Sequence, residues 1–141
     1  MSALESKELL LRVVTKFAAM QLKENGELTP FGATLNSTRK VQLLMPKSMK
    51  QNVTPDELST YWASELRTAA EKSDSQTVCS CFAGLLPHES GPAVPVFLVH
   101  IEHAGAYSED IFYPYRKEID GNICFGERVI KTVDHQVFLT N

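Results

Sequence analysis

The first two dozen positions alternate between apolar and polar residues with the period of an α-helix. The apolar stripe consists of Leu10, Val13, Val14, Phe17 and Ala18. Charged residues fall mostly on the other side of the helical wheel, which predicts a helix over residues 3–24 with one buried face. Ser2 and Glu5 have the spacing of a capping box, and Asn25-Gly26 tolerates the left-handed backbone at which helices end.

The next two segments have the period of two that is typical of strands. Apolar residues occupy alternate positions in residues 29–35 and again in residues 40–45, and the sequence Asn-Ser-Thr-Arg between them favours a turn. These residues therefore predict a β-hairpin.

A second helix is predicted from its start signal. Thr54 is a good cap, Pro55 suits the first helical position, and Glu57 is placed to reach back to the cap amide. We expect the helix to continue to about Lys72. Its buried stripe would consist of Leu58, Trp62, Leu66 and Ala69, with Tyr61 and Ala70 beside it.

The rest of the chain is rich in strand-forming residues. We expect strands at residues 76–84, 95–103 and 108–116, and one that starts near Ile123. The segment LLPHESGPAVP (85–95) contains three prolines, which predicts a loop at its centre. The Asp-Gly pair in residues 119–122 predicts a tight turn. Residues 135–140 (HQVFLT) are a candidate for a short final strand.

The predicted order is α-β-β-α-β-β-β, with a possible final strand. Short connections between consecutive strands favour an antiparallel sheet, here of five to six strands. Two helices with one apolar stripe each could cover one face of that sheet. We therefore expect a two-layer α+β fold that forms a single domain over residues 1–141.

Composition and charge exclude several classes of protein. The chain has 141 residues, 43% hydrophobic and 22% charged, which is ordinary for a globular protein. The formal net charge of −3 argues against non-specific binding of nucleic acid, which requires a basic surface. No apolar run is long enough to cross a membrane, and the N-terminus does not have the pattern of a signal peptide. The odd count of three cysteines argues against a disulfide framework, so we expect a cytoplasmic protein.

Several short motifs resemble those of a family of small uncharacterised bacterial α+β proteins. They are GELTPFGATL after the first helix, HIEHAGAYSEDIFYPY at residues 100–115, and Phe125-Gly126-Glu127. The resemblance would span most of the chain. It implies no activity, and no catalytic or binding residue is carried over from it.

The segment 100–115 is the main candidate for a functional site. On a regular strand, Val99, Ile101 and His103 share one face, whereas His100 and Glu102 share the other. Joint zinc ligation by both histidines is therefore disfavoured unless a bulge intervenes. We expect a structural hairpin in which Val99, Ile101 and His103 face the core and His100 and Glu102 face a wetter side, although the reversed pattern stays open. The candidate ligand-binding or partner-binding residues are His100, Glu102, His103, Tyr107, Tyr113 and Tyr115.

Two further segments carry reactive or apolar residues. Cys79 and Cys81 would share one face of a strand, where core packing is favoured over a metal or thiol site. Leu85 and Leu86 lie in the predicted proline-rich loop, where they could pack down or cover a partner.

The sequence favours a non-enzymatic binding or assembly module, most simply a homodimer. No motif of nucleotide binding, zinc peptidases or serine hydrolases occurs. Tyrosine-rich strands and open sheet edges suit a protein partner or a second copy. We expect no catalytic residue, no metal, no cofactor, no nucleic acid and no membrane partner. The alternatives are a small-molecule pocket between helices and sheet lined by Phe31, Tyr61 and Trp62, or a metal-dependent or thiol hydrolase that uses the His100/His103 region.

Overall fold

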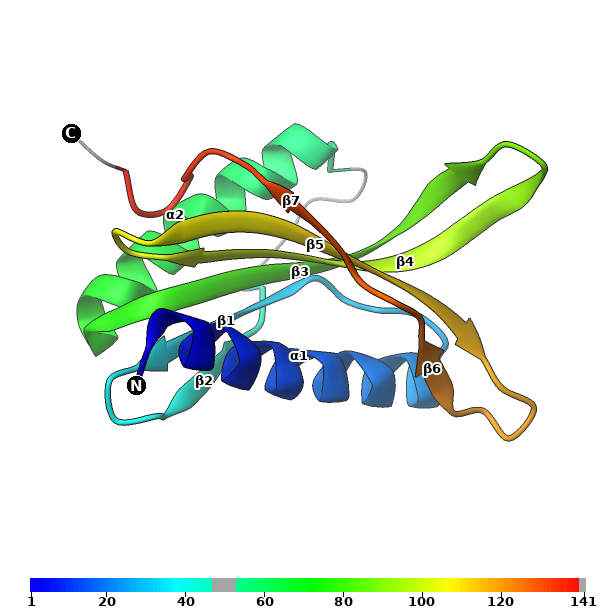
Figure 1. The fold of residues 1–141 in the computed structure, drawn as a ribbon, viewed down its shortest axis with the longest axis horizontal. Coiled ribbons are helices and arrows are strands. Elements are labelled where there is room, and N and C mark those ends of the chain that lie inside the picture. Colours follow the sequence, from blue (N-terminus) through cyan, green and yellow to red (C-terminus); the bar gives the residue numbers. More distant parts are fainter. Residues whose placement is uncertain (47–52, 140–141) are drawn as a thin grey trace.

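The computed structural model describes residues 1–46 and 53–139. Two helices and seven strands follow one another along the chain (Figure 1). They are α1 (Ala3–Asn25), β1 (Phe31–Asn36), β2 (Val41–Leu44), α2 (Pro55–Ser73), β3 (Ser75–His88), β4 (Gly91–His103), β5 (Tyr107–Lys117), β6 (Ile123–Phe125) and β7 (Val129–Thr132).

The strands form one antiparallel sheet with the order β2-β1-β3-β4-β5-β6, and β7 pairs with β5 beside β6. The α+β class, the antiparallel sheet and the predicted order of elements are confirmed. The sheet has seven strands rather than the expected five to six, and the strand that the sequence did not predict is β7.

The two helices pack on opposite faces of the sheet (Figure 1). Under α1, Val14 packs in one core with Cys79, and under α2, Trp62 packs in another core with Val78. The expected two-layer arrangement is therefore corrected to three layers: helix, sheet and helix. Val78 and Cys79 are neighbours that point to opposite faces, and both are buried, so the sheet requires cover on both sides.

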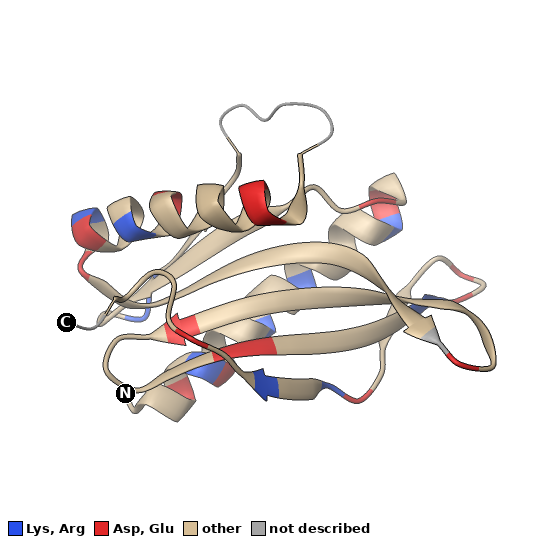
Figure 2. Cartoon of the chain, turned by 90° about the horizontal axis from the view of Figure 1, so that it is seen from above, with Lys and Arg blue, Asp and Glu red and all other residues tan. Residues whose placement is uncertain are grey.

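The charge distribution agrees with a sheet that is covered on both faces. Figure 2 shows that most charged residues lie on the helices and in the turns, whereas the strands are mostly uncharged. No helix in the described part of the chain is long and apolar enough to cross a membrane.

Local sequence signals determine the ends of both helices. The hydroxyl oxygen of Ser2 accepts a hydrogen bond from the Glu5 amide at 3.0 Å, and α1 ends before Gly26, whose φ is 76°. The hydroxyl oxygen of Thr54 accepts from the Glu57 amide at 3.1 Å, as predicted. The Glu57 carboxylate, however, accepts from the Thr54 hydroxyl rather than from the expected cap amide.

The predicted loop at the centre of residues 85–95 is shorter than expected, because only Glu89 and Ser90 form the turn between β3 and β4. The pairing of β3 with β4 continues from Leu85 opposite Pro95 to His88 opposite Gly91, and this hairpin arm projects from the body in Figure 1. Proline is tolerated because the arm pairs only with itself in the described structure. The amide of Ala104 donates to the carbonyl of Gln76 on β3, so even-numbered residues of β4 direct their amides toward β3. Pro95 is odd-numbered, so its nitrogen points away from β3 and no hydrogen bond of this strand pair is lost.

The chain end folds differently from the expected strand. The turn after β5 forms as predicted, with Gly121 at a φ of 90°. Residues 135–139 form no strand and instead cross the sheet beside α2, while Thr140 of the predicted strand lies outside the described residues.

Candidate functional site

Strand β4 places the two histidines of the candidate site on opposite faces of the sheet. His100 and Glu102 face α2, whereas His103 shares the α1 face with Val99 and Ile101, as the period of two predicted. Val99 and Ile101 are fully buried, as expected. The two imidazoles therefore do not converge on one site.

The expectation that His100 and Glu102 lie on a more solvent-exposed face than His103 is wrong. His100 is 8% exposed and Glu102 is 0% exposed, whereas His103 is only partly buried. The reason is that α2 and the end of the chain cover this face.

The Glu102 carboxylate binds the C-terminal segment, which we define as residues 133–138. It accepts hydrogen bonds from the backbone amides of Gln136, Val137 and Phe138 at 2.9, 3.0 and 3.1 Å. The ring Nδ1 of His135 lies 3.0 Å from the same carboxylate. These bonds replace the hydrogen bonds to water that Glu102 loses on burial. Without such replacement, burial of a charged carboxylate costs several kcal/mol.

The other side of the C-terminal segment is bound by α2 and β5. The Arg67 guanidinium donates to the carbonyl of Gln136 at 2.8 Å and to that of Val137 at 3.2 Å. The Ser108 hydroxyl donates to the carbonyl of Asp134 at 3.1 Å. The segment thus connects α2 to the sheet through paired polar groups.

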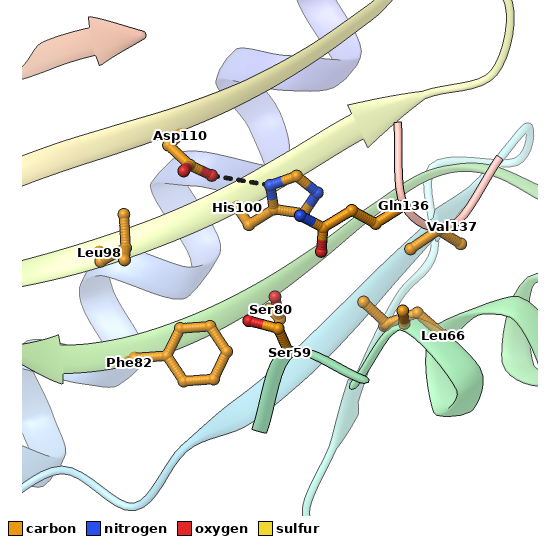
Figure 3. A pocket seen from close by; sticks show the side chains of 10 residues that line it. Ser59, Leu66, Ser80, Phe82, Leu98, His100, Asp110, Gln136 and Val137 are labelled. Carbon is orange, nitrogen blue, oxygen red and sulfur yellow. Dashed lines mark hydrogen bonds and ion pairs between the residues drawn. The ribbon is translucent and has the colours of Figure 1, made fainter. Parts of the chain in front are cut away.

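His100 lies between two carboxylates. Its Nε2 is 2.6 Å from Glu102 and its Nδ1 is 2.7 Å from Asp110 (Figure 3 shows the bond to Asp110). Two carboxylates as partners require both ring nitrogens to donate, so the imidazole is protonated. We call His100, Glu102, Asp110 and His135 the Glu102 cluster.

The pKa values agree with this charge assignment. Burial opposes the charge of His100, but the hydrogen bonds to Asp110 and Glu102 outweigh it and raise its pKa to about 9. Burial likewise opposes the charge of Glu102, but the bonds from His100 and from the amides of Gln136 and Phe138 lower its pKa to about 2. At neutral pH the pair is therefore an imidazolium and a carboxylate.

This arrangement does not suit acid–base catalysis. A general base needs a free lone pair and a pKa near the working pH. His100 has no free ring nitrogen, and the carboxylate of Glu102 is already bound to three amides and two histidines. The cluster therefore does structural work.

A small pocket lies beside the cluster, between α2 and the sheet (Figure 3). Its volume is about 70 Å³, and its polar lining comes from Ser59, Ser80, His100, Asp110 and Gln136. Ligand sites usually measure roughly 300–1,000 Å³, so this pocket has room for a few water molecules rather than for a metabolite. The expected lining residues Phe31, Tyr61 and Trp62 are not part of it.

His103 and Tyr107 form a separate group on the α1 face. Nδ1 of His103 lies 2.7 Å from the Thr77 hydroxyl, and the ring stacks on Tyr107 at 5.6 Å. Tyr107 donates to the carbonyl of Ala3, and the Lys7 ammonium lies 4.7 Å from the centre of its ring. Burial lowers the pKa of His103 and raises that of Tyr107. These contacts fix the start of α1 on the sheet.

The remaining predicted site residues pack into the core under α1. Tyr113 is 8% exposed and lies against Phe97 and Phe125, while Tyr115 is half-buried and meets Phe125 edge to face. The structure thus divides the six predicted residues into two in the Glu102 cluster and four on the opposite face.

The cysteine pair is also part of the core. Cys79 and Cys81 are fully buried under α1, with their sulfur atoms 3.9 Å apart, which agrees with the predicted packing role. Among residues 1–46 and 53–139, no group of three or more His, Cys, Asp or Glu side chains is arranged to hold a metal ion.

Sequence reasoning missed Asp110, His135 and the amides of the C-terminal segment. Asp110 lies within the candidate segment 100–115, but no pattern in the sequence indicates that it is the partner of His100. The amides lie 34 to 36 residues from Glu102 and carry no side-chain signature. Comparison with protein-family models, curated proteins and solved structures found no match, so no residue role comes from a relative.

Proposed function

We propose that the chain is a non-enzymatic assembly module that associates with a second copy of itself through an open edge of its sheet. The observation that supports this most is strand β7. All four of its residues are exposed, including Val129 at 61% and Ile130 at 43%. Within the described residues β7 pairs only with β5, so its outer edge is open.

An open edge that carries apolar side chains is a template for another strand. Its unpaired amides and carbonyls can bond to an added strand, and natural proteins usually shield such edges. The charges at this edge are few. Arg128, just before β7, donates to Glu8 at 2.9 Å, and Lys131 is the one cation within β7, directly across from Asp110. A second copy therefore meets one cation per strand, and the register of the contact decides where that cation lies.

The interior polar groups support a binding role over a chemical one. The Glu102 cluster is occupied in joining α2 to the sheet, and the pocket beside it is too small for a metabolite. The proposal therefore rests on the open edge of the sheet rather than on the Glu102 cluster or its pocket.

Light scattering after size-exclusion chromatography tests this proposal. A contact between two short strands buries little area, so we expect a dissociation constant on the order of 10 μM. The mass should rise from 15.7 kDa toward twice that value as the concentration increases. A mass of one chain at every concentration up to roughly 500 μM, fifty times that constant, would contradict the proposal.

A further inference from the structure

The edge geometry points to one register for this contact. We infer that two β7 strands pair antiparallel about a two-fold axis, with Ile130 of one copy directly opposite Ile130 of the other. This inference rests on the proposed homodimer and specifies how it forms.

The backbone of β7 determines which groups are available. The amide of Val133 donates to the carbonyl of Ser108 at 3.0 Å, in the same register in which Ile130 lies opposite Ile111. Hydrogen-bonding residues alternate along an antiparallel pair. Val129 and Lys131 therefore direct their backbone groups toward β5, and Ile130 and Thr132 direct theirs outward.

Symmetry limits the possible registers. In an antiparallel pair of identical strands the two-fold axis is perpendicular to the sheet, so each side chain stays on its own face. Directly opposite residues lie on the same face, whereas neighbours along β7 lie on opposite faces. One residue must therefore lie on the axis, opposite its own copy. Only two choices keep three of the four residues of β7 paired: Ile130 or Lys131 on the axis. With Ile130 on the axis, its own outward amide and carbonyl bond to those of the other copy.

Side-chain chemistry selects between the two choices. With Lys131 on the axis, two ammonium groups lie directly opposite each other, which destabilises a strand pair. With Ile130 on the axis, the fully buried Ile111 and the exposed Ile130 of each copy form one continuous apolar row across four strands.

The same register covers the most exposed apolar residue of the edge. Val129 ends a cross-strand row on the α2 face that consists of Phe82, Leu98, Phe112 and Val129. With Ile130 on the axis, Val129 lies opposite Lys131 of the other copy. The aliphatic stem of that lysine can cover Val129 while its ammonium stays in water.

Disulfide cross-linking tests the register. Ile130→Cys and Lys131→Cys are made in a Cys124→Ser background, since Cys79 and Cys81 are fully buried. Residues directly opposite have Cα atoms about 5.5 Å apart, within disulfide range, whereas a residue shifted by two positions lies beyond it. We therefore expect Ile130→Cys to form a covalent dimer at least about tenfold faster than Lys131→Cys under mild oxidation.

The outcomes separate the two proposals. A wild-type dimer with faster cross-linking at Lys131→Cys, or with none at Ile130→Cys, overturns the register and leaves the homodimer standing. A wild-type chain that is monomeric at every concentration overturns both. Cross-linking of Ile130→Cys that disappears on dilution below the dissociation constant, together with a concentration-dependent mass, supports both.

Discussion

Nε2 of His100 lies 2.6 Å from Oε2 of Glu102, two residues further along the same strand and on the same face. This pair looks like the start of an active site. Its surroundings give it another role, because the remaining hydrogen-bonding positions of both groups are filled by Asp110, His135 and three backbone amides. The ion pair is the anchor of the C-terminal segment.

The first prediction concerns pH. The pKa of His100 is raised from 6.5 to about 9, so its contribution to stability is complete below pH 6.5 and is lost as the pH rises to about 9. The pKa of Glu102 is lowered from 4.5 to about 2, so its contribution is complete above pH 4.5 and is lost as the pH falls to about 2. Stability should therefore be greatest between these two windows, from about pH 4.5 to pH 6.5.

Urea unfolding at several pH values measures this effect. We expect the free energy of unfolding to fall by on the order of 2 kcal/mol between pH 6.5 and pH 9.5. His100→Gln should abolish that alkaline loss, whereas His103→Gln, on the opposite face, should leave it in place. Equal alkaline losses in the wild type and in His100→Gln would show that His100 is not the charged partner.

The second prediction concerns Glu102. Glu102→Gln removes the charge from a buried carboxylate and leaves His100 with one anionic partner, so it should cost roughly 3–5 kcal/mol. Hydrogen exchange should accelerate at the amides of Gln136, Val137 and Phe138. The matched control is Glu118→Gln, because Glu118 forms an exposed ion pair with Arg116 at 3.3 Å and its loss should cost about 1 kcal/mol or less. Unchanged exchange at these amides would contradict the account of Glu102.

The third prediction concerns the close approach of α2 to β1. A Cβ atom at Gly32 would lie 2.8 Å from Cζ3 of the buried Trp62, so Gly32→Ala should destabilise the fold by about 1–3 kcal/mol. Trp62→Phe removes the atoms that clash. The double variant should therefore cost less than the sum of the two single changes, as chemical denaturation would reveal. Strict additivity would mean that the two positions do not touch.

The fourth prediction concerns the start of α2. Thr54→Ala removes the acceptor of the Glu57 amide and should cost about 1 kcal/mol. Thr68→Ala, at an exposed position within the same helix, should change stability by about 0.5 kcal/mol or less. If both variants behave alike in denaturant unfolding, the cap contributes nothing specific.

Local chemistry allowed much of the fold to be predicted. Ser2, Gly26 and Thr54 mark helix ends by hydrogen bonds within a few residues, and those bonds form in the structure. The placement of His100 and His103 on opposite faces of β4 follows from strand geometry alone. These features depend on neighbours in sequence, which a single chain displays.

The features that were not predicted depend on distant partners. Both faces of β4 are apolar, so the pattern could not show which face each helix covers. The burial of Glu102 depends on backbone amides more than thirty residues away. Strand β7 has exposed residues on both sides and therefore lacks the alternation that marks a half-buried strand.

The light-scattering mass of two edge variants tests the central claim most directly. Ile130→Asp places a carboxylate on the proposed axis of β7, and Leu43→Asp places one on β2 at the opposite edge, where Leu43 is similarly exposed at 37%. At a concentration where the wild type is mostly dimeric, we expect Ile130→Asp to have the mass of one chain, 15.7 kDa, and Leu43→Asp to keep the mass of the wild type. A dimer that survives Ile130→Asp would contradict the account.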